Sequence, residues 1–209
     1  MFTGIVQADC EVLSIEKKPG LYTLGIAMPP TMSAGLEIGA SVANNGVCLT
    51  VTAAADDRVF FDVMEETLNL TNLATLNIGD KVNVERSLTF GKEIGGHILS
   101  GHVHTQAKVV AVDNTQNHYN LQLEFAPQWQ KYIFYKGFIG VNGCSLTIGN
   151  VEGHRFWLHL IPETLRLTNL ASYRIGDWLN LEIDSQTQTI VDTVERVLSQ
   201  RLTNGLTLA

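Results

Sequence analysis

The strongest constraint on this chain is an internal repeat with an offset of 97 residues. The segment ETLNLTNLATLNIGDKVNVE (66–85) returns as ETLRLTNLASYRIGDWLNLE (163–182), and NNGVCLTV (44–51) returns as VNGCSLTI (141–148). At the same offset TGIV (3–6) aligns with SGHV (100–103). Three blocks that share one offset indicate two copies of a unit of roughly 90 residues. The unit is a duplicated domain and not a solenoid repeat, because solenoids repeat with shorter periods and in more copies.

Each copy has the pattern of several short β-strands. EVLSI (11–15), LYTLGIAM (21–28), SVANNGVCLTVTA (41–53) and RVFFDVM (58–64) carry period-two or β-branched patterns, and Gly, Pro and Asn separate them. Several strands in so small a unit favour a closed barrel, because closure removes edge strands. One short helix is expected at NLTNLATL (69–76), with Thr71 or Asn72 as its cap.

The pattern changes at the C-terminal end of the chain. In 185–202 the apolar residues recur at helical spacing, and they are Ile190, Val191, Val194, Val197, Leu198 and Leu202. This narrow stripe needs a partner, which is either the helix's own barrel or the same helix in another subunit. The expected domains are therefore 1–97, 98–184 and 185–209, the last being a helix with a tail.

Composition limits the class of protein. The net charge is −7 without a Lys/Arg block, which argues against a nucleic-acid partner. The N-terminus has no signal-peptide pattern, and no apolar run reaches the length of a membrane span, so we expect no membrane partner and a cytoplasmic protein. Three scattered cysteines and six histidines without metal-ligand spacing predict neither disulfides nor a metal site.

With the repeat established, the ordered motifs carry a resemblance. MFTGIV, NGVCLTV, IGGHILSGHV, YKGFIGVNGCSLT and HLIPETL occur in the order typical of the riboflavin synthases of the trimeric α-chain type. Each motif alone is weak, but the ordered set within a duplication is specific, and it covers essentially residues 1–200. One departure is Asn142, where the family often has aspartate. We expect this change to tune the loop without loss of activity.

The resemblance implies a fold and a reaction. The fold is all-β, with two tandem similar six-stranded antiparallel Greek-key barrels and a C-terminal α-helix that assembles a homotrimer. The enzyme is a transferase that dismutates two 6,7-dimethyl-8-ribityllumazine molecules. A four-carbon unit passes between them and gives riboflavin and 5-amino-6-(D-ribitylamino)uracil, the last step of riboflavin biosynthesis. No cofactor takes part, and a functional link to lumazine synthase is expected. The alternative is a non-catalytic lumazine or flavin binder of the fluorescent antenna type.

The resemblance places three residues as catalytic: Cys48, His102 and Ser41. Cys48 is otherwise read as a small buried hydrophobe, and Ser41 as a hydroxyl at a strand edge. His102 replaces Ile5 of the first copy and could move protons near neutral pH, with His97 as its rival. Ser145 takes the place of Cys48 in the second copy and is expected to bind rather than react.

The remaining expected site residues are substrate-binding, and the backbones of Leu49 and Leu146 are expected to join hydroxyl groups in holding the ring. The alternatives are a solvated side chain for Lys136 and helix capping for Glu66 and Glu163, while Cys144 is expected only to pack. The substrate-binding set is Gly4, Ile5, Val6, Cys48, Leu49, Thr50, Asp62, Val63, Met64, Glu65, Glu66, Thr67, Gly101, His102, Val103, Lys136, Ser145, Leu146, Thr147, His159, Leu160, Ile161, Pro162, Glu163 and Thr164.

Overall fold

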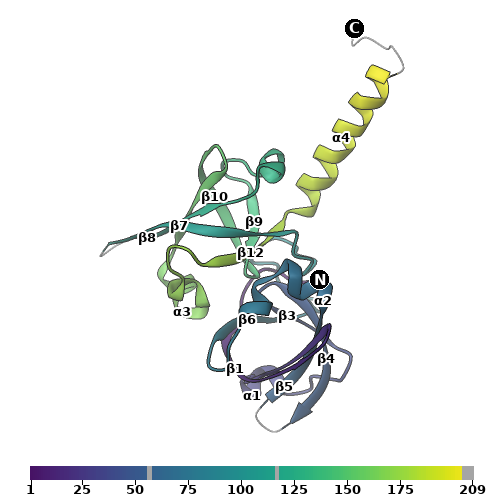
Figure 1. Cartoon of the computed structure of the whole chain (residues 1–209), viewed down its shortest axis with the longest axis vertical. Coiled ribbons are helices and arrows are strands. Elements are labelled where there is room, and N and C mark those ends of the chain that lie inside the picture. Colours follow the sequence, from purple (N-terminus) through teal and green to yellow (C-terminus); the bar gives the residue numbers. More distant parts are fainter. Residues whose placement is uncertain (56–57, 116–117, 204–209) are drawn as a thin grey trace.

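The structure is a computed structural model, and it describes residues 1–55, 58–115 and 118–203. Two closed barrels lie side by side, and a long C-terminal helix points away from both (Figure 1). The strands of the first barrel are β1 (Ala8–Lys18), β2 (Leu21–Ile26), β3 (Ser41–Asn44), β4 (Val47–Ala55), β5 (Arg58–Met64) and β6 (Lys81–Arg86). Those of the second are β7 (Thr105–Thr115), β8 (His118–Glu124), β9 (Phe138–Val141), β10 (Cys144–Glu152), β11 (Arg155–Leu160) and β12 (Trp178–Ile183).

Both barrels have the same strand order. In the first it is β1-β2-β5-β4-β3-β6, and in the second β7-β8-β11-β10-β9-β12. The hairpin-linked strands β3, β4 and β5 lie together, and β6 returns by a long connection to lie beside β3, which is a Greek key. Pairing of β6 with β1 closes the wall. The predicted all-β fold of two six-stranded antiparallel barrels with a C-terminal helix is confirmed.

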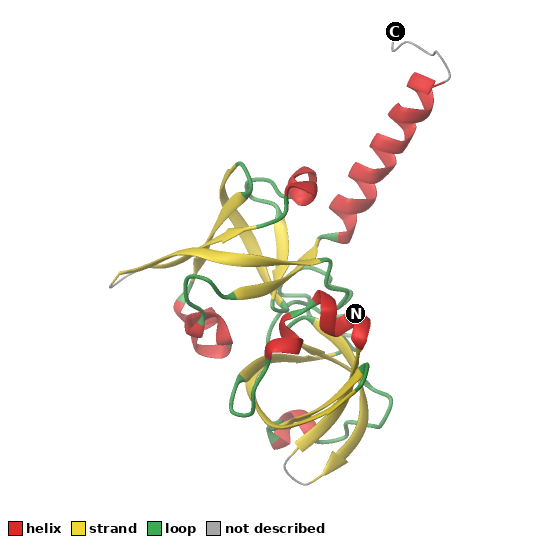
Figure 2. Cartoon of the chain, in the orientation of Figure 1, coloured by secondary structure: helices red, strands yellow, loops and turns green. Residues whose placement is uncertain are grey.

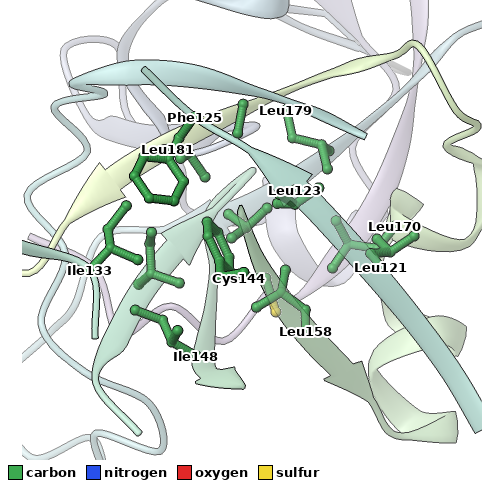
Figure 3. Packing of buried hydrophobic residues seen from close by; sticks show 14 of the residues in the cluster. Leu121, Leu123, Phe125, Ile133, Cys144, Ile148, Leu158, Leu170, Leu179 and Leu181 are labelled. Atoms are coloured by element: carbon green, nitrogen blue, oxygen red, sulfur yellow. The ribbon is translucent and has the colours of Figure 1, made fainter. Parts of the chain in front are cut away.

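Alternate residues of each strand fill the barrel interiors. In the second barrel Leu121 and Leu123 of β8 pair with Leu158 and Phe156 of β11, and all four are fully buried. Figure 3 shows Leu121, Leu123 and Leu158 in this cluster. Cys144 belongs to the same cluster. Its predicted packing role is confirmed.

Short helices connect the strands at equivalent places in the two barrels (Figure 2). The α-helices are α1 (Pro30–Ser33), α2 (Glu65–Leu70), α3 (Pro162–Leu167) and α4 (Ser185–Thr203), and the 3₁₀ helices are η1 (Asn72–Thr75), η2 (Pro127–Tyr132) and η3 (Asn169–Ser172). The equivalent pairs are α2 with η1 in the first barrel and α3 with η3 in the second.

The single short helix expected over 69–76 is instead divided between α2 and η1. Thr71 separates them, because its φ of −126° and ψ of 163° are extended. The Thr71 hydroxyl donates to the carbonyl of Thr67, so it closes α2 and does not cap η1. Thr71 therefore occupies the expected N-cap position, that of η1, but its side chain makes no capping hydrogen bond.

The helix α4 is anchored at its first turns. Asp184 accepts hydrogen bonds from the backbone N–H and hydroxyl of Thr187 and so caps the helix. Lys131 pairs with Asp192 and Glu195, and Val191 packs against the second barrel. Beyond these contacts α4 extends into solvent (Figure 1). Within the described ranges, no helix combines the length and hydropathy that crossing a membrane requires.

Candidate active site

Two Asn-Gly turns bring the repeated phrases back to back between the barrels. Asn45 and Gly46 have φ angles of 47° and 80°, and Asn142 and Gly143 have 43° and 78°. Positive φ at both central residues is the requirement of a type I′ hairpin turn. A Cβ atom on Gly46 would lie 2.6 Å from the backbone nitrogen of Gly143. Glycine is therefore required both by the turn and by the approach of the other turn.

Buried asparagines join the two barrels around these turns. The backbone N–H of Asn72 donates to Oδ1 of Asn180 at 2.8 Å, and at the equivalent place Asn169 donates to Oδ1 of Asn83 at 2.7 Å. All the amides of the network are at most 5% exposed, and they come from Asn45, Asn72, Asn83, Asn142, Asn169 and Asn180. These contacts recur 97 residues apart, so the barrels are related by an approximate twofold axis. Asn142, the departure from the family pattern, belongs to this network.

Residues 3–6 precede the first barrel and residues 100–103 precede the second. Each of these exchanged segments packs against the opposite barrel. The carbonyl of Gly101 accepts from the N–H of Cys48 at 2.9 Å, and the carbonyl of Gly4 accepts from the N–H of Ser145 at 2.8 Å. Val103 is buried in the core of the first barrel, whereas Val6 is buried in the core of the second. Each repeated phrase is therefore covered by a segment from the other half of the chain.

A buried carboxylate holds each exchanged segment. Glu182 of β12 accepts from the N–H and hydroxyl of Ser100 at 2.6 and 2.7 Å, and from the N–H of Gly101 at 3.1 Å. Glu85 of β6 holds Thr3 in the same way, at 2.6 and 2.7 Å. Burial raises the pKa of both carboxyls, and the donated hydrogen bonds oppose that rise. Sequence reasoning missed this pair. The sequence feature that indicates the pair is a glutamate at the same position in both copies, at the end of VNVE (82–85) and of LNLE (179–182).

The first candidate site, which we call the first pocket, is a surface on the outer face of β3 and β4. Ser41 pairs with Thr50, and Cys48, two residues from Thr50, shares its face. Cys48 is half-buried. A Cβ atom on Gly101 would lie 2.6 Å from Cβ of Cys48, so the exchanged segment with His102 lies against this cysteine. The structure brings the predicted Ser41, Cys48, Thr50 and Gly101 together, and it places His102 next to them with an exposed side chain.

Further predicted residues continue this face on β5 and α2. Asp62 is exposed and accepts a hydrogen bond from the Thr23 hydroxyl at 2.7 Å. Met64 ends the strand with 68% of its surface exposed. Glu65 and Glu66 lie exposed in the first turn of α2, where acidic side chains stabilise the helix dipole. No side chain of the described residues makes a capping hydrogen bond at the start of α2, so the structure does not show the capping role that was the alternative for Glu66.

The second candidate pocket is a cavity of about 350 Å³ on the second barrel. It lies on the face of β10 and β11 that is equivalent to the Cys48 face. The predicted residues that line it are Lys136, Ser145, Leu146, Thr147, His159, Ile161 and Thr164. Sequence reasoning did not include Tyr135, Ile148 and Gly149, which complete the lining.

Lys136 has an unusual backbone for its residue type. Its φ is 66°, in the left-handed region, and the equivalent Gly39 of the first copy has φ of 89°. A side chain there costs about 1–3 kcal/mol relative to glycine, so a lysine in this conformation is an indication of function. Its ammonium lies 5.2 Å from the ring centroid of Tyr135 at the cavity.

His97, which the sequence ranked behind His102, contacts the second pocket. Its Nδ1 lies 2.6 Å from Oγ of Ser145, and its ring stacks on Phe138 with centroids 5.2 Å apart. Burial lowers the pKa of His97, and the charge of Asp184 partly opposes this. Nε2 is buried and has no protein partner among the described residues. His97 therefore contacts Ser145, whereas His102 follows Gly101, the residue whose backbone contacts Cys48.

Several predicted residues turn their side chains away from both pockets. Leu49, Val63, Leu160, Val6 and Val103 are at most 8% exposed and pack in the barrel cores. Their backbone groups are what they can offer to a ligand.

The start of α3 holds two more of the predicted residues. Pro162 and Glu163 lie in its first turn, and Glu163 is paired with Arg166 at 2.9 Å. Ile5 is exposed at 46% on the segment that covers Ser145.

The three cysteines differ in burial. Burial raises the pKa of the Cys10 and Cys144 thiols to about 12, which keeps both protonated. Cys48 is the more accessible of the three. Among the described residues no group of three or more His, Cys, Asp or Glu could hold a metal ion.

Comparison with known proteins identifies the family. The lumazine binding domain model matches residues 3–87 and 100–184. Riboflavin synthase of Escherichia coli (strain K12) is 52% identical over 204 residues, covering 96% of this chain and 95% of the relative. Riboflavin synthase of Buchnera aphidicola subsp. Schizaphis graminum is 44% identical, with coverage of 96% and 97%.

Solved structures of LumP also match. The complex with riboflavin has a TM-score of 0.82 at 28% identity, and that with 6,7-dimethyl-8-(1'-D-ribityl) lumazine has 0.81 at 26%. Each covers 88% of this chain and 100% of the other. On the near full-length identity to the two synthases and the two matched domains, this chain belongs to the riboflavin synthase family.

Proposed function

We propose that this chain is a riboflavin synthase that dismutates two molecules of 6,7-dimethyl-8-ribityllumazine. One molecule gives a four-carbon unit to the other, which yields riboflavin and 5-amino-6-(D-ribitylamino)uracil, and the enzyme is a transferase. The observation that carries the proposal is the pair of equivalent pocket faces in one chain, built around Cys48 and Ser145. A reaction between two copies of one molecule needs two similar sites.

The pockets contribute mainly by holding the two substrates in a reactive orientation. Such positioning can provide about 7–11 kcal/mol of barrier reduction without acid–base chemistry. We assign the chemical role to Cys48 with His102 and Ser41, because the first pocket combines an accessible thiol with a histidine. We assign binding to Ser145, Lys136 and the residues that line the cavity.

A homotrimer is part of the proposal. The exposed stripe of α4 consists of Ile190, Val194, Val197, Leu198 and Leu202, and most of it lies beyond the contacts of the helix with its own barrel. Such a stripe fits the packing of helices from several subunits. The assembly would place the first pocket of one subunit against the second pocket of its neighbour.

A cytoplasmic location and a functional link to lumazine synthase complete the proposal. All three cysteines are free, which fits a reducing compartment. The substrate must come from an enzyme that forms the lumazine ring, and that is the basis of the link.

The second candidate function is a non-catalytic lumazine or flavin binder, favoured by the structural match to ligand-bound LumP. The deciding experiment incubates the purified protein with 6,7-dimethyl-8-ribityllumazine. Formation of riboflavin in proportion to enzyme and time supports the synthase. Quenching or a spectral shift of the lumazine without riboflavin formation would establish the binder instead.

A further inference from the structure

The backbone contact at Cys48 depends on a chain of hydrogen bonds that begins in the opposite barrel. Glu182 lies on β12 of the second barrel and is 5% exposed. It accepts from the N–H and hydroxyl of Ser100 and from the N–H of Gly101. Gly101 in turn accepts from the N–H of Cys48 in the first barrel. The exchanged segment thus links Glu182 to the strand that carries the thiol.

The same carboxylate also sets the position of His102. The Ser100 hydroxyl donates to Glu182 and accepts from the N–H of His102 at 3.1 Å. The direction of the first hydrogen bond leaves the oxygen lone pairs of Ser100 free to accept the second. The φ of 83° at Gly101 places the peptide that carries His102 against Cys48. A shift of this turn would move His102 together with the Gly101 backbone that covers Cys48.

We propose that Glu182 is a positioning residue for the Cys48 pocket, and that its repeat partner Glu85 has the same role for the Ser145 pocket. Neither carboxylate reaches the pocket faces itself, because both are buried under the segments that they hold. Each acts across the barrel boundary, so each half of the chain controls the pocket of the other. The inference deepens the proposed function and rests on it for its kinetic consequences.

The approximate twofold symmetry supplies a matched control. Glu85 holds Thr3 and Gly4, and Gly4 contacts Ser145 as Gly101 contacts Cys48. Glutamine retains one acceptor oxygen but replaces the other with an NH₂ donor, which faces a backbone N–H and cannot accept from it. Glu182→Gln and Glu85→Gln therefore loosen equivalent turns by the same chemical change, each over a different pocket.

The first readout is independent of activity. We expect iodoacetamide to alkylate Cys48 in Glu182→Gln at least about tenfold faster than in the wild type, because a charge-assisted hydrogen bond of the covering turn is lost. Glu85→Gln should alkylate at the wild-type rate. Cys10 and Cys144, which lie in the barrel cores, should remain unmodified in all three proteins and so report that the barrels are folded. Peptide mass spectrometry assigns the label.

The second readout is the separation of kcat from KM with the lumazine substrate. Glu182→Gln should lower kcat by roughly 10- to 100-fold with little change in KM, since misplacement of reacting groups has effects of this size. Glu85→Gln should mainly raise KM, because it loosens the binding pocket. Equal alkylation of Cys48 in Glu182→Gln and the wild type, or equal acceleration in both variants, would overturn the proposal.

Two milder variants cover the case in which the glutamine proteins do not fold. Ser100→Ala and Thr3→Val remove the hydroxyls that donate to the carboxylates and leave the carboxylates buried. Faster labelling of Cys48 in Ser100→Ala but not in Thr3→Val supports the inference, and the absence of that difference contradicts it. Labelling does not require turnover, so a protein without synthase activity would refute the proposed function while leaving this test decisive.

Discussion

At the scale of single residues, the two copies differ at one equivalent position, which is Cys48 in the first and Ser145 in the second. Cys48 and Ser145 occupy the same position in equivalent hairpins, each paired across its strand and covered by a glycine from the other half. Their surroundings differ, because Ser145 hydrogen-bonds to His97 whereas Cys48 contacts the backbone of Gly101 and the following His102 is exposed. The difference predicts unequal effects of mutation.

Replacing Cys48 should cost more turnover than replacing Ser145. We expect Cys48→Ser to lower kcat roughly 100-fold, which is the lower end of the range of about 10²–10⁴ that a group assisting proton transfer provides. Ser145→Ala should act mainly on KM, because it removes a hydroxyl from the binding cavity. Steady-state kinetics with the lumazine measures both, and a larger loss of kcat in Ser145→Ala would reverse the assignment.

His97 should make the fold sensitive to mild acid. Burial keeps the pKa of His97 below its ordinary value of 6.5, so below that pH the unfolded chain binds more protons than the folded chain. This contribution to the free energy of unfolding is complete above pH 6.5 and is lost as the pH falls towards and through the folded-state pKa. His97→Asn should therefore show a flatter decline over that range in urea unfolding experiments.

The buried carboxyls titrate with the opposite sign. Their pKa values are raised, so their contribution is present below pH 4.5 and is lost as the pH rises through the folded-state pKa. Subtracting the His97→Asn profile from that of the wild type cancels their effect. Parallel profiles for the two proteins would show that His97 is not the group responsible.

At the scale of elements, the turns between strands are constrained by what they meet. Gly46 meets the backbone of Gly143, whereas a Cβ atom on Gly79, whose φ is 93°, would have nothing within 4 Å among the described residues. Both turns need a positive φ, but only the first also needs the space. Comparing alanine at the two positions separates these two requirements.

Gly46→Ala should lose about 1–3 kcal/mol more of the free energy of unfolding than Gly79→Ala, the usual cost of overpacking a well-packed contact. Backbone strain from the positive φ is common to both variants and cancels in the comparison. Urea unfolding monitored by tryptophan fluorescence gives the two values. Equal losses would mean that the barrel contact relaxes without cost.

Mutations in helix α4 test whether this helix holds a trimer together. Leu198→Asp places a charge on the apolar stripe, and the neighbouring Ser199→Asp places the same charge beside it on an exposed polar position. If the stripe holds a trimer, sedimentation should show smaller species for Leu198→Asp and unchanged ones for Ser199→Asp. Removal of residues from Ser185 onward should also dissociate the assembly, and a truncated trimer would reject the role of the helix.

At the scale of the whole molecule, the repeat and the strand pattern together predicted two similar barrels, whereas their six strands and Greek-key order came from the family resemblance. Strand periodicity and turn glycines are local properties, and the 97-residue offset required that both halves fold alike. The helix α4 was predictable because its apolar spacing is also a local property. The divided α2 and η1 were not, because the break at Thr71 is set by its extended backbone and not by a breaking residue.

The exchange of segments between barrels could not be predicted from the sequence. Alignment pairs Gly4 with Gly101 but does not say on which barrel either glycine packs, since an intact and an exchanged arrangement have the same local pattern. For the same reason the sequence shows that Glu85 and Glu182 are repeated but does not show which residues they bind. The pocket phrases were recognisable because they recur, whereas the residues that position them act over a sequence separation of 82 residues.

The reciprocal exchange also suggests how such a chain arises. Two separate copies of one barrel, each lending its leading segment to the other, would form a symmetric dimer with two identical sites. Joining the copies into a single polypeptide removes the requirement that both sites change together. The first copy can then have Cys48 where the second has Ser145. Likewise one exchanged segment can have His102 where the other has Ile5.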